Sequence, residues 1–519
     1  MLPEDLLRPD AWPHPRPVRV DLVETHVSWV LFGDREVLKI KKPVALGFLD
    51  FRSLERRRVA CQNEVRLNTR LAPGVYLGVV PIVRSGARLS VGGPGEVADW
   101  AVHMRRLDDD GRADSMLERG SLTYDQLDAV ARALADFHRA APVSEAIALR
   151  WASPSALEAN VRENFGQTAG LAREYLDERE ADDVERAQLA FVAEHQALLF
   201  KRIETGRVRD GHGDLRLEHV YLHHEGLRII DCIEFDERYR IGDVCSDIAF
   251  LSMDLAGHGQ VASSEWFLAR YAQHSGDYDL YALVDFYESY RAWVRAKVSA
   301  ILACDPGASE DVHRRAALEA RRHFMLARAC MRPPLAPPLL VCVGGVIGSG
   351  KSTVAEKLSA ALSCAVVDSD RTRKQILAIA ETQAQNDPAW TGAYSPGTTA
   401  RVYGEALRRA SVVLASHRPV IVDASFRSSS MRHRAREIAR SRGAGFVFVE
   451  CRAPVDVCRA RLTSRSRGPS DGRPALLEEF VASFEPMTEL ASSEHVVVDT
   501  TQPVERTIDA LRARLSDAS

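Results

Sequence analysis

A glycine-rich loop that ends in a lysine and a serine marks the C-terminal third of the chain. Its sequence, Gly345-Val346-Ile347-Gly348-Ser349-Gly350-Lys351-Ser352, has the spacing G-x-x-x-x-G-K-S between an apolar strand pattern and a helix pattern. Such glycines let backbone N–H groups wrap phosphate oxygens, and the following helix adds its N-terminal dipole. The pattern predicts that a nucleotide binds Gly345, Gly348, Ser349, Gly350, Lys351, Ser352 and Thr353, with Mg²⁺ on the Ser352 hydroxyl.

Two aspartates follow the next predicted strands. The strand at residues 365–368 leads to Asp370, whose carboxylate could take the proton of an acceptor hydroxyl, although a helix N-cap is an equally simple interpretation. The strand at residues 420–424 contains Asp423, a carboxylate suited to magnesium. Because strands alternate with helices here, we expect a parallel sheet with its ligands at the carboxyl ends of the strands.

An arginine-rich stretch further along could neutralise a migrating phosphoryl group. Arg465, with Arg461 and Arg467, flanks a Gly-Pro-Ser-Asp-Gly turn and could close over the site as a lid. A solvated helix end is the alternative interpretation. The chain has 68 lysines and arginines, of which only eight are lysines. Each retained lysine is therefore a hint that lysine itself is needed at that position.

A second set of acids and bases lies in the N-terminal half. Asp214 precedes one short strand pattern, and Asp231 ends another. Phosphoryl transfer to a hydroxyl needs one carboxylate to orient or deprotonate the nucleophile and a second to hold magnesium. These two aspartates are candidates for the two roles, and simple capping of turns is the alternative.

A lysine and a glutamate upstream could complete this second site. Lys39 lies in a predicted strand, and Glu64 lies in the helix that follows. A buried pair of the two would aim Lys39 at the α- and β-phosphates of ATP. Lys41 faces the same side of the strand, so it is an alternative to Lys39.

The two sets of residues lie in regions with different patterns. Strand-like alternation dominates up to residue 106, around one helix at about 54–71, and helical patterns dominate from 123 to 331. The prolines of residues 332–338 can neither continue a helix nor pair in a central strand, so we place a domain boundary there. We predict an α+β bilobal protein-kinase-like domain at 1–334, with a small lobe at about 1–106 and a large lobe at about 107–334, and an α/β P-loop domain with a parallel sheet at 335–519.

The C-terminal segment resembles the small P-loop kinase family that includes polynucleotide kinase, gluconate kinase and chloramphenicol phosphotransferase. The resemblance covers nearly all of residues 339–515. It implies that Asp370 is the general base, that Arg373 binds the acceptor and that Arg465 is the lid arginine. Members of this family phosphorylate very different acceptors, so the resemblance implies a reaction type and not a substrate.

The N-terminal half resembles the aminoglycoside phosphotransferase family, which is related to the protein kinases. His212-Gly213-Asp214 matches the catalytic-loop motif of that family, and Ile229-Ile230-Asp231 matches its metal-binding segment. The resemblance extends over about residues 20–300. It implies that Asp214 is catalytic and that Asp231 holds the metal.

Two positions depart from that family's pattern. The family has a metal-binding asparagine five residues after the catalytic aspartate, where this chain has His219. Imidazole favours softer ions than Mg²⁺, so Mn²⁺ is an alternative metal for this site. No glycine-rich loop occurs near the N-terminus, and the hydroxyl of Ser28 could contact phosphate instead. A half that binds ATP or a partner without catalysis, and regulates the P-loop half, is therefore an alternative.

The whole arrangement resembles a bacterial two-part family that joins these two kinds of domain. The net charge of −4 gives no electrostatic footprint for nucleic acid or a membrane surface, and the nine irregularly spaced cysteines favour a reducing cytoplasm. No apolar run approaches the roughly 18 residues of a membrane span, so we expect a cytoplasmic protein without a membrane segment. No basic stripe with interleaved aromatics runs through residues 339–519. We therefore expect an ATP-dependent kinase with two independent nucleotide sites and a small hydroxylated acceptor, rather than a nucleic-acid end kinase. The sequence carries no signal for an oligomeric state.

Overall fold

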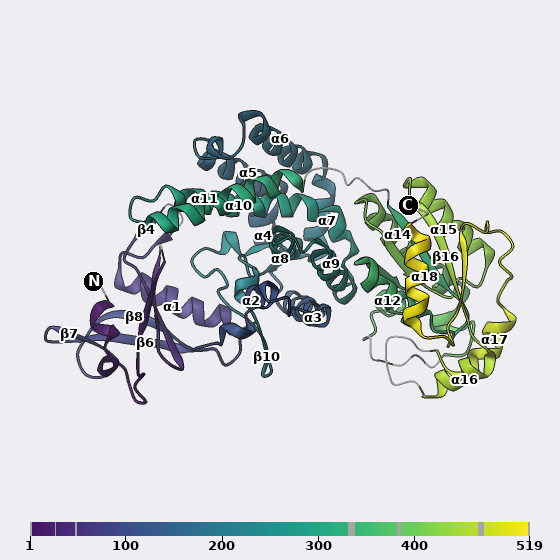
Figure 1. Cartoon of the computed structure of the whole chain (residues 1–519), viewed down its shortest axis with the longest axis horizontal. Helices are drawn as coiled ribbons and strands as arrows, with labels where there is room; N and C mark the ends of the chain where they lie inside the picture. The colour runs from purple at the N-terminus through teal and green to yellow at the C-terminus, as the bar shows by residue number, and fades with distance from the viewer. Residues whose placement is uncertain are drawn as a thin grey trace. The chain divides into compact units, whose positions relative to one another are not determined.

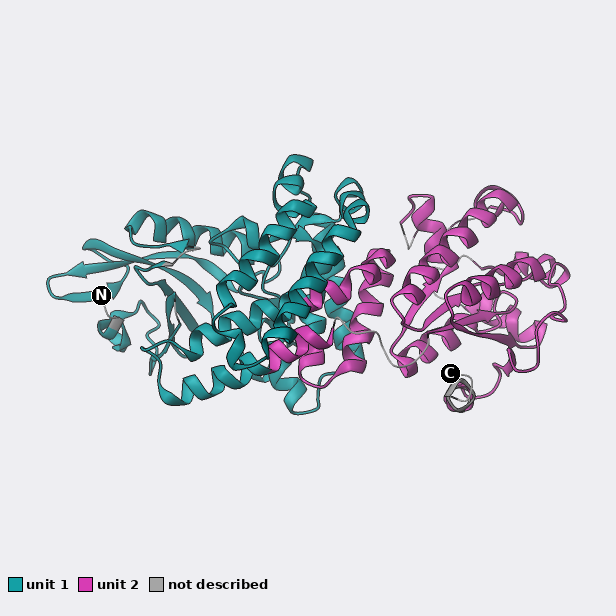
Figure 2. Ribbon diagram, turned by 90° about the horizontal axis from the view of Figure 1, so that it is seen from above, with its two compact units in different colours: residues 1–254, 290–321 teal, residues 255–289, 322–519 magenta. Residues whose placement is uncertain are grey.

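The computed structural model describes residues 3–516, except 26, 47–48, 331–337, 381–382, 384, 386 and 465–471. The chain forms two compact units, each made of two separate stretches of the sequence (Figures 1 and 2). Unit 1 comprises residues 1–254 and 290–321, and unit 2 comprises residues 255–289 and 322–519. In the part of the chain that is described, no helix is both long enough and apolar enough to cross a membrane.

Unit 1 begins with a six-stranded antiparallel sheet in the order β1-β2-β3-β8-β6-β7. Alternate side chains of a strand face opposite sides of a sheet. Leu38 and Ile40 therefore pack against the N-terminal 3₁₀ turns, whereas Val37 packs against helix α1. The elements of this lobe are β1 (Asp21–Glu24), β2 (Ser28–Phe32), β3 (Glu36–Lys41), β4 (Ala45–Leu46), β5 (Leu49–Asp50), α1 (Leu54–Asn68), β6 (Tyr76–Ser85), β7 (Arg88–Val91) and β8 (Glu96–Arg105).

The rest of unit 1 is mostly helical. Two small antiparallel pairs, β9 with β12 and β10 with β11, interrupt the helices and carry the loops of the N-terminal site. Helices α8, α10 and α11 have residues in both units. The elements are α2 (Ala113–Glu118), α3 (Tyr124–Ala140), α4 (Glu145–Ala152), α5 (Pro154–Thr168), α6 (Glu178–Glu194), α7 (Gln196–Glu204), β9 (Val208–Asp210), β10 (Val220–His223), β11 (Gly226–Ile229), β12 (Ile241–Asp243), α8 (Val244–Gly257), α10 (Val284–Ala303) and α11 (Glu310–Ala329).

Unit 2 is built on a five-stranded parallel sheet in the order β14-β15-β13-β16-β17. Val341, Ile421 and Val447 face one apolar core, which helices α12 and α18 cover (Figure 1). The elements are α9 (Val261–Ser275), β13 (Leu339–Gly344), α12 (Lys351–Leu362), β14 (Ala365–Asp368), α13 (Ser369–Ile376), α14 (Pro396–Ala415), β15 (Val420–Asp423), α15 (Ser429–Ser441), β16 (Gly445–Arg452), α16 (Val455–Ser464), α17 (Leu477–Ala482), β17 (His495–Asp499) and α18 (Val504–Ser516). The predicted fold class, a kinase-like α+β domain followed by a parallel α/β P-loop domain, is confirmed.

Unit 2 also contains a segment that precedes the proline-rich joint. Helix α9 and the 3₁₀ turn Tyr278–Ala282 pack against β14 and α14. The Tyr278 hydroxyl donates to the carbonyl of Val366 at 2.5 Å, and Arg270 pairs with Glu356 at 2.5 Å. Most of the joint lies outside the described residues, and the domain boundary there stays a prediction. A cut at residue 334 would nevertheless divide unit 2.

A partly buried arginine holds this segment to the sheet. Arg418, which precedes β15, lies 2.9 Å from the carboxylate of Glu265 and 2.7 Å from that of Asp285. Burial disfavours its charge, but the two carboxylates outweigh burial and raise the pKa of Arg418 well above its usual range. Removal of this cation would leave two acids without their partner inside one unit.

We expect Arg418→Gln to lower the unfolding free energy of unit 2 by about 2 kcal/mol, a figure reduced because both acids are partly solvated. That loss corresponds to a fall of about 4–8 °C in the melting temperature of a unit this size. The control is Arg408→Gln, which removes a more exposed pair with Asp279 and should cost less than about 1 kcal/mol. Scanning calorimetry of the intact chain measures both, and equal melting of Arg418→Gln and wild type would contradict the prediction.

Candidate active sites

The N-terminal site is centred on a glutamate that two lysines share. The Nζ atom of Lys39 lies 2.9 Å from Oε1 of Glu64, and that of Lys41 lies 2.5 Å from its Oε2. Lys39 also contacts Asp231 at 2.6 Å, and Lys41 also pairs with Glu234. Burial opposes the charge on Lys39, but Asp231 and Glu64 outweigh it and raise its pKa well above the usual range. Sequence reasoning offered Lys39 and Lys41 as alternatives, but both pair with Glu64, and each has a different second partner.

Small-lobe residues hold the segment that follows β11. The N–H of Asp231 donates to the Tyr76 hydroxyl at 3.2 Å, and the N–H of Cys232 donates to Oδ1 of Asn68 at 2.8 Å. Asp231 itself has φ 64°, a backbone conformation that costs about 1 kcal/mol or more for a residue with a side chain. Together with the Lys41–Glu234 pair, these bonds fix the direction of the Asp231 carboxylate.

The catalytic-loop motif is organised by a buried aspartate in α8. Asp247 accepts hydrogen bonds from the N–H groups of His212 at 2.6 Å and Gly213 at 2.8 Å. Gly213 has φ 84°, and a Cβ atom there would lie 2.7 Å from the carbonyl oxygen of Tyr239, so the position requires glycine. Burial lowers the pKa of His212 to about 4, which keeps its ring neutral. Its Nε2 then donates to the carbonyl of Ile230 at 2.9 Å.

Asp214 and His219 lie next to each other on this loop. The Nδ1 atom of His219 is 2.7 Å from the Asp214 carbonyl oxygen, so it carries the proton and leaves the lone pair on Nε2. That Nε2 lies 3.7 Å from Oδ2 of Asp231. Arg216 binds both carboxylate oxygens of Asp214, at 3.0 and 3.2 Å. Burial favours the neutral acid, but Arg216 and His219 outweigh it and hold the pKa of Asp214 well below its usual range.

The turn between β1 and β2 stands where a glycine-rich loop was expected from the family. The N–H of Ser28 donates to the Thr25 hydroxyl at 3.0 Å, and the N–H of Thr25 donates to the Ser28 carbonyl at 2.9 Å. The Ser28 side chain is fully buried, and among the described residues its hydroxyl has no partner. A phosphate contact from Ser28 stays a prediction, and it would require this tight turn to open.

The glycine-rich loop of unit 2 has the backbone that phosphate binding requires. Gly345, Gly348 and Gly350 have φ values of 141°, 77° and 89°. A Cβ atom at Gly345 would lie 2.4 Å from the carbonyl oxygen of Cys451, and one at Gly348 would lie 2.7 Å from that of Cys458. The loop can therefore fold over the sheet edge only with glycine at these positions.

Side chains inside and behind this loop hold its shape. Lys351 donates to the Val346 carbonyl at 2.9 Å, which closes the loop from within. Behind it, Thr500 donates to the carbonyl of Ser349 at 2.7 Å, and Arg461 donates to Thr500. Arg461 therefore supports the loop in this structure. Arg465 and Arg467 lie outside the described residues, so the lid itself stays a prediction.

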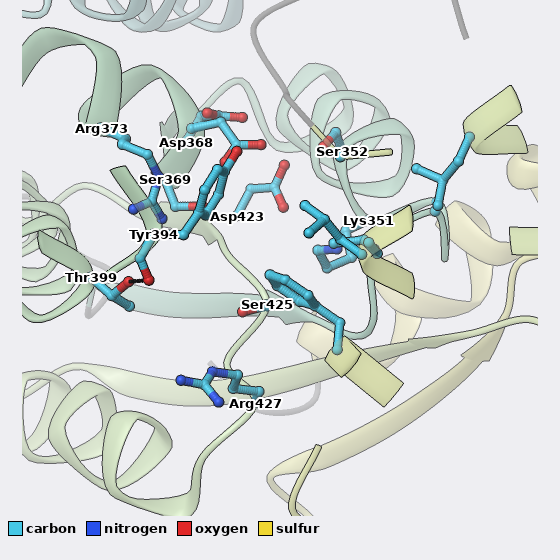
Figure 3. Close-up of a pocket in the computed structure, with 18 of the residues that line it drawn as sticks. Lys351, Ser352, Asp368, Ser369, Arg373, Tyr394, Thr399, Asp423, Ser425 and Arg427 are labelled. Atoms are coloured by element: carbon cyan, nitrogen blue, oxygen red, sulfur yellow. Dashed lines mark hydrogen bonds between the residues drawn. The ribbon is translucent and has the colours of Figure 1, made fainter. Parts of the chain in front are cut away.

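A pocket of about 390 Å³ joins the loop to the ends of β14 and β15. Eight of the predicted site residues line it: Gly348, Gly350, Lys351, Ser352, Thr353, Asp370, Arg373 and Asp423. Figure 3 shows Asp423 and Lys351 near the middle of this pocket, with Arg373 on one side.

The aspartates of the pocket have distinct roles in the local structure. Asp368 caps helix α13 by accepting from the N–H of Arg371 at 2.6 Å. Asp370 lies in the first turn and is not the cap, so the capping interpretation of Asp370 is wrong. Burial, with the nearby carboxylates of Asp423 and Asp370, raises the pKa of Asp368 to about 8.

The far end of the pocket is lined by aromatic rings and arginines. The guanidinium of Arg373 lies 4.8 Å from the Tyr394 ring, and that of Arg427 lies 4.0 Å from the Trp390 ring. Trp390 stacks on Phe480 with ring centroids 5.2 Å apart. Sequence reasoning did not identify these rings, Arg427 or Asp368. Only Asp368 had a signal in the sequence, because it ends a predicted strand.

Magnesium fits the donor atoms of both sites only in combination with a nucleotide. Asp231 with His219, and Ser352 with Asp423, each offer two protein ligands at most. In the described residues no three His, Cys, Asp or Glu side chains are grouped as a complete metal site. Magnesium is commonly held by one or two carboxylates together with phosphate oxygens and water, so this sparse set fits Mg²⁺ bound with ATP.

Comparison with known families covers both halves. A model described as the phosphotransferase enzyme family matches residues 33–292, and one described as an AAA domain matches residues 340–487. Uncharacterized proteins of Mycobacterium tuberculosis (strain H37Rv) and Mycobacterium bovis are each 34% identical to the chain over 462 residues, which is 89% of this chain and 89% of each relative.

Solved structures are similar to parts of the chain. A gluconokinase from Sinorhizobium meliloti is 24% identical and covers 35% of this chain and 93% of its own, with a TM-score of 0.27. A choline/ethanolamine kinase family protein from Mesorhizobium loti is 13% identical and covers 60% of this chain and 92% of its own, with a TM-score of 0.34. The two family matches and the mycobacterial relatives, rather than these structures, show that the chain belongs to the phosphotransferase enzyme family, joined here to a P-loop AAA domain, and is a nucleotide-binding phosphotransferase.

Proposed function

We propose that the protein is a cytoplasmic ATP-dependent kinase with two nucleotide sites, which moves the γ-phosphoryl group of ATP to a hydroxyl of a small molecule. One observation carries the proposal. A single pocket joins the phosphate loop at Lys351 and Ser352 to a candidate base, Asp370, and a candidate acceptor contact, Arg373. A cavity of about 390 Å³ is within the usual range for small-molecule sites.

In the P-loop site the proposed reaction is a direct displacement. The acceptor hydroxyl oxygen forms a bond to the γ-phosphorus, and the bond from that phosphorus to the β,γ-bridging oxygen breaks. The electron pair of the broken bond leaves with ADP, and the hydroxyl proton passes to Asp370. Lys351 and the loop N–H groups neutralise phosphate charge. Ser352 and Asp423 would hold Mg²⁺, which supplies further positive charge at the phosphates.

In the kinase-like site Asp214 would orient the acceptor hydroxyl, and Lys39 would bind the nucleotide phosphates. Asp231 and His219 would hold the metal, whose charge offsets that of the phosphates. The geometry supports one further step: Lys39 must exchange its contact with Asp231 for phosphate, while Lys41 remains on Glu64. Glu64 then remains paired with a cation throughout this exchange.

A second candidate is an N-terminal half that binds ATP or a partner and regulates the P-loop half. Two observations favour it. Arg216 occupies both oxygens of Asp214, and Ser28 is buried in a tight turn. An acceptor hydroxyl could reach Asp214 only if Arg216 moved or shared the carboxylate.

Calorimetry with a non-hydrolysable ATP analogue and Mg²⁺ should give two sites per intact chain. Lys351→Ala should weaken one site at least about tenfold, because it removes a charge at the phosphates, and Asp231→Ala should weaken the other by a similar factor. Each variant acts as the control for the other, because the residues lie in different units. A stoichiometry of one that is lost with Lys351→Ala alone would replace the two-kinase proposal with the regulatory one.

Asp370→Asn should lower transfer at the P-loop site by about 10²- to 10⁴-fold and leave ATP affinity nearly unchanged, because the amide keeps the shape but cannot accept the proton. The matched control is Asp368→Asn. Asparagine caps helices as well as aspartate does, so the fold should be preserved and the loss of rate should be much smaller. Initial rates and ATP titrations of both variants decide between the two aspartates, and a larger loss in Asp368→Asn would move the base to Asp368.

His219→Asn should raise the ratio of Mg²⁺- to Mn²⁺-supported activity of the N-terminal site by about tenfold, because an amide oxygen replaces the Nε2 lone pair near Asp231. The assay is best made in the Lys351→Ala background, which removes P-loop activity. His195→Asn is a control, because the ring of His195, the C-cap of helix α6, bonds to the carbonyl of Phe191 and stacks on the Phe191 ring. If the ratio does not change in His219→Asn, His219 does not contact the metal.

A further inference from the structure

The pocket of unit 2 contains an arginine whose charge is almost fully buried. Arg373 is only 6% exposed. One of its terminal nitrogens donates to the Ala393 carbonyl at 2.6 Å, and its ring contact is Tyr394, but among the described residues no carboxylate pairs with it. Its Nε atom is buried and has no hydrogen-bond partner there. Burial of a cation in this state is unfavourable unless an anion joins it.

A second arginine approaches the same end of the pocket from the loop after β15. The backbone around Arg427 is fixed: its carbonyl accepts from the N–H of Glu485 at 2.8 Å, and the carbonyl of Phe426 accepts from Arg432 at 2.9 Å. Phe426 has φ 47° and Trp390 has φ 62°, which are strained values for such residues. The guanidinium of Arg427 rests on Trp390 and pairs with no carboxylate of the described residues.

Several other buried or partly buried arginines of unit 2 differ from Arg373 and Arg427. Five of them lie against a carboxylate. The pairs are Arg270–Glu356, Arg409–Glu405, Arg418–Glu265, Arg432–Glu489 and Arg436–Glu494. The third arginine of the pocket, Arg461, is satisfied by Thr500 and the loop. At the acceptor end of the pocket, by contrast, neither Arg373 nor Arg427 has a carboxylate partner among the described residues.

The space between Arg373 and Arg427 is lined by hydroxyl groups and aromatic rings. Figure 3 draws Tyr394, Thr399 and Ser425 between Arg373 and Arg427. The Ser425 hydroxyl bonds to that of Tyr403 at 3.1 Å, and the rings of Trp390 and Phe480 form an adjoining wall. A ligand here would meet two planar cation donors, hydroxyl groups and aromatic faces, a set suited to a hydroxylated carbon skeleton with an ionised group.

We infer that the acceptor phosphorylated in the P-loop pocket is an anion, a hydroxylated molecule whose carboxylate or phosphate group is bound by Arg373 and Arg427 while its hydroxyl faces Asp370. This inference rests on the proposed function of the same pocket and narrows its substrate class. Asp370 and Arg373 are three residues apart on α13 and so lie on one face of the helix. The hydroxyl and the ionised group are therefore separated by only a few bonds in the acceptor.

The test is a panel of polyols with three to six carbons, each as the neutral polyol, the aldonate carboxylate and the phosphate monoester. Transfer from labelled ATP is measured with the intact chain, and the rate with Lys351→Ala is subtracted. We expect the ionised members to exceed the neutral ones by at least about tenfold in kcat/KM. The ionised series with the higher kcat/KM, carboxylates or phosphates, identifies which of the two anions is bound.

Variants show whether the arginines cause this preference. Arg427→Gln and Arg373→Gln should each lower kcat/KM for the best ionised acceptor by about 10- to 100-fold, mainly through KM, and leave ATP affinity unchanged. Arg427→Lys should recover part of the loss, because it keeps the charge but not the planar contact with Trp390. Arg442→Gln, at an exposed arginine bonded to Ser411, is the control and should match the wild type.

Two outcomes separate this inference from the proposed function. Equal use of neutral and ionised polyols, unchanged in Arg427→Gln and Arg373→Gln, would overturn the anionic acceptor and leave the kinase standing. If no member is phosphorylated in a Lys351-dependent way, the proposed function fails for this class of acceptor. Calorimetry of the ionised members with the chain loaded with the ATP analogue then tests anion binding separately from catalysis. Binding that either variant weakens supports it, and no binding overturns it.

Discussion

Charge that is removed from water must be balanced by opposite charge, and this constraint determines how the acids and bases of both sites are arranged. Glu64 is fully buried in helix α1, so its two oxygens each need a cation. Lys39 and Lys41 meet that need because they point to the same side of β3. Their other partners, Asp231 and Glu234, belong to the loop after β11. One buried carboxylate therefore connects a strand, a helix and the loop that carries the metal-binding aspartate.

The same connection makes the position of Asp231 depend on the small lobe. The strained backbone at Asp231 persists because neighbouring groups over-determine it, through bonds to Tyr76 and Asn68. Asn68 lies one helical turn after Glu64 and bonds back to its carbonyl at 2.9 Å. Movement of α1 would thus disturb the lysine pair and the aspartate together. Such coupling pre-organises the site, since its cation-binding and phosphate-binding groups move as one set.

The sequence predicts those parts of the sites that are fixed by short motifs. The P-loop, Asp214 and Asp231 follow from spacing within a few residues, and the parallel pairing of the strands in unit 2 follows from strands alternating with helices. Glu234, Arg427 and Trp390 could not be identified, because their roles come from approaches between distant segments. The packing of α9 with the P-loop sheet was not predicted for the same reason. The role of Arg418 can be recognised only when the structure places it beside Glu265 and Asp285.

The two sites are left with opposite surpluses of charge, and this difference indicates what each one lacks. Around Glu64 three carboxylates face two ammonium groups, so negative charge is in excess. Burial, with a smaller contribution from the charge of Glu64, raises the pKa of Glu234. A metal cation would remove that excess. At the acceptor end of the P-loop pocket, Arg373 and Arg427 pair with no carboxylate of the described residues, so positive charge is in excess there. An anion would remove it. A ligand that binds only the folded state stabilises that state. Relief of the unfavourable charge at each site therefore adds to the affinity for a ligand of opposite charge.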